Sequence, residues 1–141
     1  MQLNSKIIVI CGPTASGKSD VANLLAKQIN GEVISADSMQ IYKGMDIGTG
    51  KLPKSQRLAK HWGIDIVSQN KPYSAALFQK YSRDCFKKIK DAGKTPILCG
   101  GTGFYIRAAI DDYDFSADEQ NENLIRAKYQ QYLNKNGVHA L

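Results

Sequence analysis

Apolar residues gather along this chain in short continuous runs, which alternate with longer segments of helical period. The runs at 6–11, 32–35 and 95–99 are rich in Ile, Val and Leu and do not alternate with polar residues. Such runs are typical of parallel strands that are buried on both faces. A further short run at 63–67 predicts one more strand.

Helical spacing of apolar residues predicts four helices. The first follows the run at 6–11 and is expected to stop at Gly31, and the second spans 73–93 with Ser74 as its N-cap. The third opens after residues 100–103, and the fourth begins near residue 116 and ends at Gly137. The first helix is expected to bury Val21, Leu24, Leu25 and Ile29, and the second Phe78, Tyr81, Cys85, Ile89 and Ala92.

Strands that alternate with helices predict an α/β fold. We expect residues 1–141 to form one three-layer α/β/α domain of the phosphate-loop type, with a mainly parallel sheet that is incomplete on its C-terminal side. Ligands of such sheets bind beyond the carboxyl ends of the strands. The polar, Gly-rich segment 36–53 leaves one of these ends, so we expect it to be functional or mobile.

Composition and charge narrow the class of protein. The chain has 141 residues and a formal net charge of +6, which favours polyanionic partners. It carries three cysteines and no apolar run of membrane-spanning length, so we expect a reduced, cytoplasmic protein without a membrane partner. Cys11 and Cys99 each end an apolar run, and both are expected to be small buried residues.

The first strand leads directly into a phosphate-binding loop that fits the pattern G-x-x-x-x-G-K-[ST]. The loop reads Gly12-Pro13-Thr14-Ala15-Ser16-Gly17-Lys18-Ser19. Gly12 and Gly17 are expected to adopt positive φ, so that successive N–H groups point inward, and the following helix adds its positive N-terminal end. Lys18 would reach a distal phosphate, and the Ser19 hydroxyl would bind Mg²⁺.

The residues alone leave several uses of this loop open. A nucleotide or small-molecule kinase is the commonest, but it needs an acid after a second apolar strand, where this chain has Gly100-Gly101-Thr102-Gly103. A GTPase would need Asn-Lys-x-Asp, and Asn134-Lys135-Asn136-Gly137 lacks the Asp. A binding module without chemistry is less attractive because Asp37 is placed to act as an acid or base above the sheet.

Three strings together resemble the tRNA dimethylallyltransferases. They are the phosphate loop, the string Ser35-Ala36-Asp37-Ser38-Met39-Gln40-Ile41-Tyr42-Lys43-Gly44-Met45-Asp46-Ile47-Gly48-Thr49, and Gly100-Gly101-Thr102-Gly103-Phe104-Tyr105. Tyr73-Ser74-Ala75-Ala76-Leu77-Phe78 is similar to a further stretch of the family. The matches run from residue 7 to about residue 110 in the family's order.

The resemblance implies transfer of a dimethylallyl group from dimethylallyl diphosphate to N6 of an adenosine beside the tRNA anticodon. The loop, with Mg²⁺ at Ser19 and with Thr102, would hold the diphosphate, and Thr14 would lie close to the reacting centre. Asp37 matches the family's catalytic aspartate. Ser38, Met39 and Gln40 match positions that, with Asp37, hold the target adenosine. The resemblance also implies a monomer that acts on the anticodon stem-loop.

Two departures from the family pattern shape our expectations. Members commonly carry His-His-Leu-Ile-Asp where this chain has His61-Trp62-Gly63-Ile64-Asp65, so His61 is left without a role. The family continues beyond the region matched here into a helical tRNA-gripping insertion. We therefore expect this chain to bind diphosphate but to prenylate tRNA weakly or not at all. An adenylate isopentenyltransferase and a kinase remain the alternatives.

Overall fold

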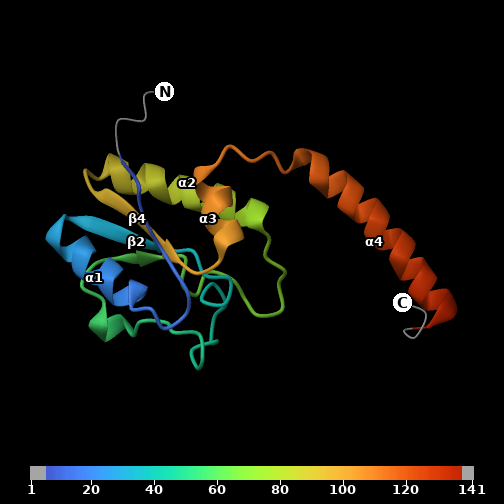
Figure 1. Ribbon diagram of the computed structural model, residues 1–141, viewed down its shortest axis with the longest axis horizontal. Coiled ribbons are helices and arrows are strands. Elements are labelled where there is room, and N and C mark those ends of the chain that lie inside the picture. The colour runs from blue at the N-terminus through green and yellow to red at the C-terminus, as the bar shows by residue number, and fades with distance from the viewer. Residues whose placement is uncertain (1–5, 138–141) are drawn as a thin grey trace. The chain divides into compact units, whose positions relative to one another are not determined.

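The computed structural model describes residues 6–137, and for residues 116–122 it describes the backbone alone. The chain forms two compact units, one that ends at Asp111 and one that begins at Asp112 (Figure 1). None of the described helices is both long and apolar enough to span a bilayer.

The first unit is built on a four-stranded sheet in the order β1-β4-β2-β3. The strands are β1 (Ile8–Cys11), β2 (Gly31–Ser35), β3 (His61–Trp62) and β4 (Thr95–Gly100), and every pair is parallel. The predicted parallel sheet is thus confirmed. The prediction of a strand at 63–67 is wrong. The strand β3 lies just before this range, and residue 67 contributes only an isolated bridge to Tyr42.

Helices cover both faces of this sheet and give the predicted three layers. The helix α1 (Lys18–Gln28) lies on one face, and α2 (Ala75–Asp91) and α3 (Gly103–Ile110) lie on the other (Figure 1). Side chains alternate along the strands accordingly. Val33, Ile97 and Cys99 pack with α1, while α2 contacts β2 and β4 from the opposite side. A short 3₁₀ turn, η1 (Lys54–Gln56), precedes β3.

The buried face of α1 differs from the predicted one. Ala22 and Ala26 face the sheet, whereas Val21 and Leu24 are each 55% exposed. Of the predicted residues, Leu25 packs against this core as expected, and Ala22 and Ala26 take the central contact because small side chains let the helix approach the sheet closely. The expected stop at Gly31 is also wrong: the chain reverses at Asn30, with φ 54°, and Gly31 already belongs to β2.

The helix α2 largely follows the prediction. The Ser74 hydroxyl accepts a hydrogen bond from the Leu77 N–H at 3.2 Å, as expected of an N-cap. Phe78, Cys85 and Ile89 are buried as predicted. Ala92, in contrast, is the exposed C-cap. Tyr81 is only half-buried, and its hydroxyl accepts a hydrogen bond from the Gly63 N–H.

The strand β1 is less buried than its composition predicts. Ile8 and Ile10 pack toward α1, but Val9 and Cys11 are exposed. The prediction of a buried Cys11 is therefore wrong, whereas that of a buried Cys99 is confirmed. The reason is position: β1 is an edge strand, and α2 packs over β2 and β4.

The second unit contains the predicted last helix, α4 (Ser116–Asn136). The helix ends at Gly137, whose φ of 77° makes it a natural stop. Ahead of the helix, the rings of Tyr113 and Phe115 lie 4.6 Å apart.

Candidate active site

A polar cleft of about 90 Å³ lies beyond the carboxyl ends of β2 and β4. The phosphate loop, the segment after β2 and the end of β4 all contribute to it, because parallel strands bring their carboxyl ends to one edge. It is lined by Thr14, Ala15, Lys18, Ser19, Ser35, Asp37, Gln40, Thr49, Gly50, Cys99 and Gly100. The structure thus brings together four predicted loop residues with Asp37 and Gln40, which are distant in sequence.

The loop backbone turns at different residues from those predicted. Gly17 has φ 80°, as expected, and it is the N-cap of α1. The second left-handed residue is Ala15, with φ 62°, and Gly12 is not left-handed. Gly12 is needed for space instead, since a Cβ there would lie 3.2 Å from the Ser16 hydroxyl oxygen.

Side chains brace the loop from within. The Pro13 carbonyl oxygen accepts hydrogen bonds from the Ser16 hydroxyl and from the Lys18 ammonium, both at 2.8 Å. Pro13 and Ser16 therefore shape the loop without lining the cleft. Lys18 and Ser19, the first residues of α1, do line it, so a full positive charge and a hydroxyl face the same space as the N-terminal end of the helix.

Asp37 faces the cleft from the turn that follows β2. Its Oδ1 accepts hydrogen bonds from the N–H groups of Met39 at 2.9 Å and Gln40 at 3.4 Å, so this oxygen caps the turn. The carboxylate therefore has a fixed orientation at the cleft. Met39, on the same turn, is exposed outside the cleft.

Thr102 supports the Asp37 turn from behind. Its Oγ1 accepts a hydrogen bond from the Ser38 N–H at 3.0 Å and donates to the Ser38 hydroxyl at 3.3 Å. The Thr102 N–H donates to the carbonyl of Ala36 at 3.2 Å. Thr102 and Ser38 are not among the residues that line the cleft, so the predicted contacts of Thr102 with phosphate and Ser38 with RNA remain predictions.

Sequence reasoning did not assign two lining residues, Ser35 and Thr49, that hold the Gln40 side chain. The Ser35 hydroxyl donates to Gln40 Oε1 at 2.8 Å, and Gln40 Nε2 donates to the Thr49 carbonyl at 3.0 Å. Thr49 and Gly50 thereby line the cleft together with residues of the phosphate loop. Their place within the segment 36–53 was the available signal, because a polar segment at a strand's carboxyl end is where ligands bind.

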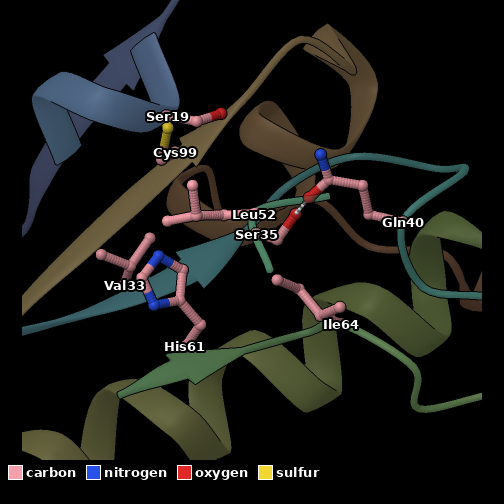
Figure 2. A pocket seen from close by; sticks show the side chains of 8 residues that line it. All are labelled: Ser19, Val33, Ser35, Gln40, Leu52, His61, Ile64 and Cys99. Atoms are coloured by element: carbon pink, nitrogen blue, oxygen red, sulfur yellow. Dashed lines mark hydrogen bonds between the residues drawn. The ribbon is translucent and has the colours of Figure 1, made fainter. Parts of the chain in front are cut away.

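Behind the cleft lies a smaller cavity of about 20 Å³ (Figure 2). Ser19, Ser35, Gln40 and Cys99 line both spaces. His61 closes the smaller one from β3. Its Nδ1 lies 3.0 Å from the carbonyl oxygen of Ala59, and burial together with the nearby charge of Arg57 lowers the pKa of the ring. His61 is therefore a neutral wall residue of this inner cavity at neutral pH.

Cys99 contributes a neutral thiol to the cleft. Burial raises its pKa to about 11, against the opposing charge of Lys18 and with a further contribution from Asp37. Its Sγ lies 3.5 Å from the backbone carbonyl oxygen of Lys18. A thiol with this pKa is not a nucleophile at neutral pH, in agreement with the predicted role of Cys99 as a small buried residue.

Lys51 holds the segment 36–53 in place and was not predicted. Its ammonium group donates to the Tyr42 carbonyl at 2.6 Å, to Asp65 at 2.7 Å and to Asp46 at 3.0 Å. The side chain is only 5% exposed. Burial alone would lower the pKa of Lys51, but the two carboxylates outweigh burial and raise it. Lys51 therefore stays charged and ties both ends of this loop to the β3 region.

Replacing Lys51 with Met should destabilise the protein by about 2 kcal/mol, because charged hydrogen bonds are lost while partly exposed carboxylates regain water. Urea unfolding measures this change. The control is Lys54→Met, which removes an exposed lysine of η1 and should leave the free energy of unfolding unchanged. Equal stability of both variants would show that Lys51 does not hold the loop.

The donor set of the cleft fits Mg²⁺ that arrives with a phosphate ligand. Mg²⁺ prefers oxygen ligands, keeps several waters and is commonly held by one or two protein oxygens plus substrate phosphates. Ser19 offers such an oxygen in the cleft. Among residues 6–137, no group of three or more His, Cys, Asp or Glu residues is arranged to hold a metal ion by itself.

Family models match this chain over most of its length. The model described as IPP transferase matches residues 40–141, and the model described as isopentenyl transferase matches residues 5–72. The chain belongs to the IPP transferase family. The cleft described above is therefore the phosphate-loop side of an IPP transferase fold.

Relatives with assigned names agree with this membership. The chain is 49% identical over 136 residues to a tRNA dimethylallyltransferase of Carboxydothermus hydrogenoformans. The matched region covers 96% of this chain and 43% of that protein. The chain is 46% identical over 134 residues to a tRNA dimethylallyltransferase of Caldicellulosiruptor saccharolyticus, with 94% and 43% covered. The chain thus spans less than half the length of these IPP transferase relatives.

Solved structures show the same fold. A tRNA isopentenylpyrophosphate transferase of Staphylococcus epidermidis superposes with a TM-score of 0.74 at 42% identity, covering 95% of this chain and 45% of that one. A eukaryotic dimethylallyltransferase, described as acting on tRNA, superposes with a TM-score of 0.75 at 36% identity, covering 80% and 29%. The predicted α/β fold of the phosphate-loop type is confirmed.

Proposed function

We propose that this chain forms the donor-diphosphate site and supplies the catalytic carboxylate of a tRNA dimethylallyltransferase. In this reaction a dimethylallyl group passes from dimethylallyl diphosphate to N6 of an adenosine beside the anticodon, and diphosphate leaves. The observation that carries the proposal is the single cleft that Lys18, Ser19 and Asp37 share. The Lys18 ammonium, which suits the leaving diphosphate, and the Asp37 carboxylate, which suits the incoming amine, therefore face the same small cleft.

The phosphate loop acts on the leaving group. Negative charge grows on the diphosphate as the bond from carbon to oxygen breaks, and fixed positive groups stabilise that growing charge. Lys18 and the N-terminal end of α1 supply such groups, and the bonds within the loop hold its shape beforehand. Mg²⁺ bound to the diphosphate, with Ser19 as a protein ligand, would neutralise further charge.

Asp37 acts on the nucleophile. An exocyclic amine attacks poorly while its lone pair is delocalised into the ring, and it must lose a proton after the new bond to carbon forms. The capped carboxylate of Asp37 is held at the cleft to accept a hydrogen bond from that amine and then its proton. Thr14 lines the same cleft, and in this proposal it lies close to the reacting centre.

The cleft favours this reaction over phosphoryl transfer. β4 ends in Gly100, a cleft residue, and Gly101 and Thr102 follow where a kinase would carry an acid for Mg²⁺. A free nucleotide such as AMP remains an alternative acceptor to tRNA, because the isopentenyl transferase model also matches residues 5–72. Transfer to a tRNA anticodon stem-loop and to AMP should therefore be compared, and we expect the RNA to be the acceptor.

The donor site can be tested by ligand-induced stabilisation of the chain. Dimethylallyl diphosphate with Mg²⁺, at about 100 times its Kd, should stabilise the fold by about 2.7 kcal/mol. Replacing Lys18 with Met removes charge-assisted bonds to the diphosphate worth about 1.5–3 kcal/mol and should weaken binding roughly 10- to 100-fold. Thermal unfolding with and without the ligand measures both.

Lys27→Met serves as the matched control, because Lys27 is an exposed lysine in the last turn of the same helix. It should respond to dimethylallyl diphosphate like the unmodified chain. Stronger stabilisation by ATP than by dimethylallyl diphosphate would reject the proposed donor and favour a kinase.

A further inference from the structure

We propose that Ile47 is a base-contacting wedge, which packs against an anticodon-loop base beside the target adenosine and keeps the target out of the stack. The inference rests on the proposed function and adds an RNA-contact residue on the turn that leads into Thr49 and Gly50 of the cleft lining. It starts from one side chain: Ile47 is 98% exposed. No other large apolar side chain of the described residues is so open to solvent.

The loop that carries Ile47 is held firmly at several points. Lys51 bonds to the carboxylate of Asp46, the neighbour of Ile47, and to the Tyr42 carbonyl. The Thr49 hydroxyl donates to the Met45 carbonyl at 2.7 Å and closes the turn around Ile47. A large apolar side chain is therefore presented to solvent from a braced turn, where side-chain ordering on binding costs little.

The tip itself is free of neighbouring structure. Gly48, directly after Ile47, has φ 77°, and a Cβ added there would meet no heavy atom within 4 Å. Open space on this side leaves room for a flat ligand such as a nucleobase. A single exposed apolar residue is ordinary on protein surfaces, so the place of Ile47 relative to the cleft is what distinguishes it.

Ile47 lies beside the cleft wall. Thr49, two residues further on, lines the cleft with Gly50, and Gln40 Nε2 holds the Thr49 carbonyl at 3.0 Å. Two residues span roughly 7 Å at most, so Ile47 is within one base's length of the cleft entrance. Met39, on the turn that Asp37 caps, is a second exposed apolar side chain on the cleft-forming segment.

The chemistry of the proposed reaction gives this position a use. The target base must leave its neighbours before N6 can enter a cleft of about 90 Å³ beside Asp37. Unstacking exposes the faces of the flanking bases to water, and apolar side chains inserted at base steps cover such faces. The Ile47 side chain, two residues before the cleft-lining Thr49, can replace the lost stacking partner, while Asp37 receives the amine inside.

The experiment uses an anticodon stem-loop RNA whose target adenosine is replaced by 2-aminopurine, which fluoresces more strongly when unstacked. The whole chain should bind this RNA and raise its fluorescence. Ile47→Ser should bind about 10-fold more weakly, as expected for losing the burial of one apolar side chain, and should raise the fluorescence less. Ile47→Leu should restore both. Because Ile47 is exposed, each variant should unfold at the same temperature as the unmodified chain.

Two controls separate this inference from the proposed function. Leu24→Ser removes another exposed apolar side chain, on α1, and should change neither RNA affinity nor fluorescence. Stabilisation by dimethylallyl diphosphate should be equal in all variants, and its absence from the unmodified chain would reject the donor site instead.

Three results would overturn the wedge. Ile47→Ser could bind and unstack the RNA as the unmodified chain does, or the unmodified chain could bind dimethylallyl diphosphate but no stem-loop RNA. Ile47→Ser could also alter self-association while leaving RNA binding unchanged, which would make Ile47 a contact for protein.

Discussion

Replacing Asp37 with Asn should slow prenyl transfer by about 10²- to 10⁴-fold, the usual contribution of a positioned acid or base. The amide oxygen of Asn can still accept the hydrogen bond that Asp37 Oδ1 takes from the Met39 N–H, so the turn keeps its cap. What the variant loses is the proton acceptor. Single-turnover assays with excess protein, labelled dimethylallyl diphosphate and an anticodon stem-loop would measure even slow transfer.

Two comparisons give this result its meaning. Asp37→Asn should be stabilised by dimethylallyl diphosphate as strongly as the unmodified chain, because the phosphate loop is intact. Asp37→Ala should lose the turn cap as well, and about 1 kcal/mol of stability with it. If Asp37→Asn abolished diphosphate binding instead, Asp37 would be a ligand to the metal or a structural residue and not the proton acceptor.

Replacing Gly100 with Ala should destabilise the fold by about 3 kcal/mol, at the upper end of overpacking effects. A Cβ at Gly100 would overlap the carbonyl group of Ala36, which is backbone and cannot rotate away. The overlap falls where β4 meets the segment leaving β2, so the Asp37 turn should shift too. Urea unfolding measures the stability, and the response to dimethylallyl diphosphate reports on the cleft.

The adjacent glycine provides the control. A Cβ at Gly101 would lie 3.5 Å from the Gly12 carbonyl oxygen and 3.7 Å from Lys18 Cε, which are ordinary contacts. Gly101→Ala should therefore keep the stability of the unmodified chain. If both variants were equally stable, the close approach of β4 to Ala36 would not be a constraint on the fold.

The sequence predicted the site better than it predicted the packing. The phosphate loop and Asp37 were placed correctly together, because each follows a strand and parallel strands expose their carboxyl ends at one edge. No comparable rule predicted which residues of α1 face the sheet or that Cys11 is exposed. Those depend on which strand lies at the edge of the sheet and on how closely a helix approaches it.

The residues that support the site were also beyond sequence reasoning. In the sequence, Lys51 is indistinguishable from a surface lysine. Only the structure shows that it bonds to Asp46, Asp65 and the Tyr42 carbonyl. The Thr102 hydroxyl bonds to Ser38 and steadies the Asp37 turn, a supporting role that the sequence did not suggest. Such roles are set by partners distant in the chain, which no local pattern reveals.

The Pro13 carbonyl accepts two hydrogen bonds, and this affects which ligands the loop can bind. With both lone pairs occupied by Ser16 and Lys18, this oxygen has no acceptor capacity left for a hydroxyl of an incoming molecule. Beside the Pro13 carbonyl, the loop can therefore attract only groups that accept hydrogen bonds from it. A hydroxyl can still accept hydrogen bonds from the loop but finds no acceptor here for its own proton, whereas a fully ionised oxyanion only accepts and therefore loses nothing.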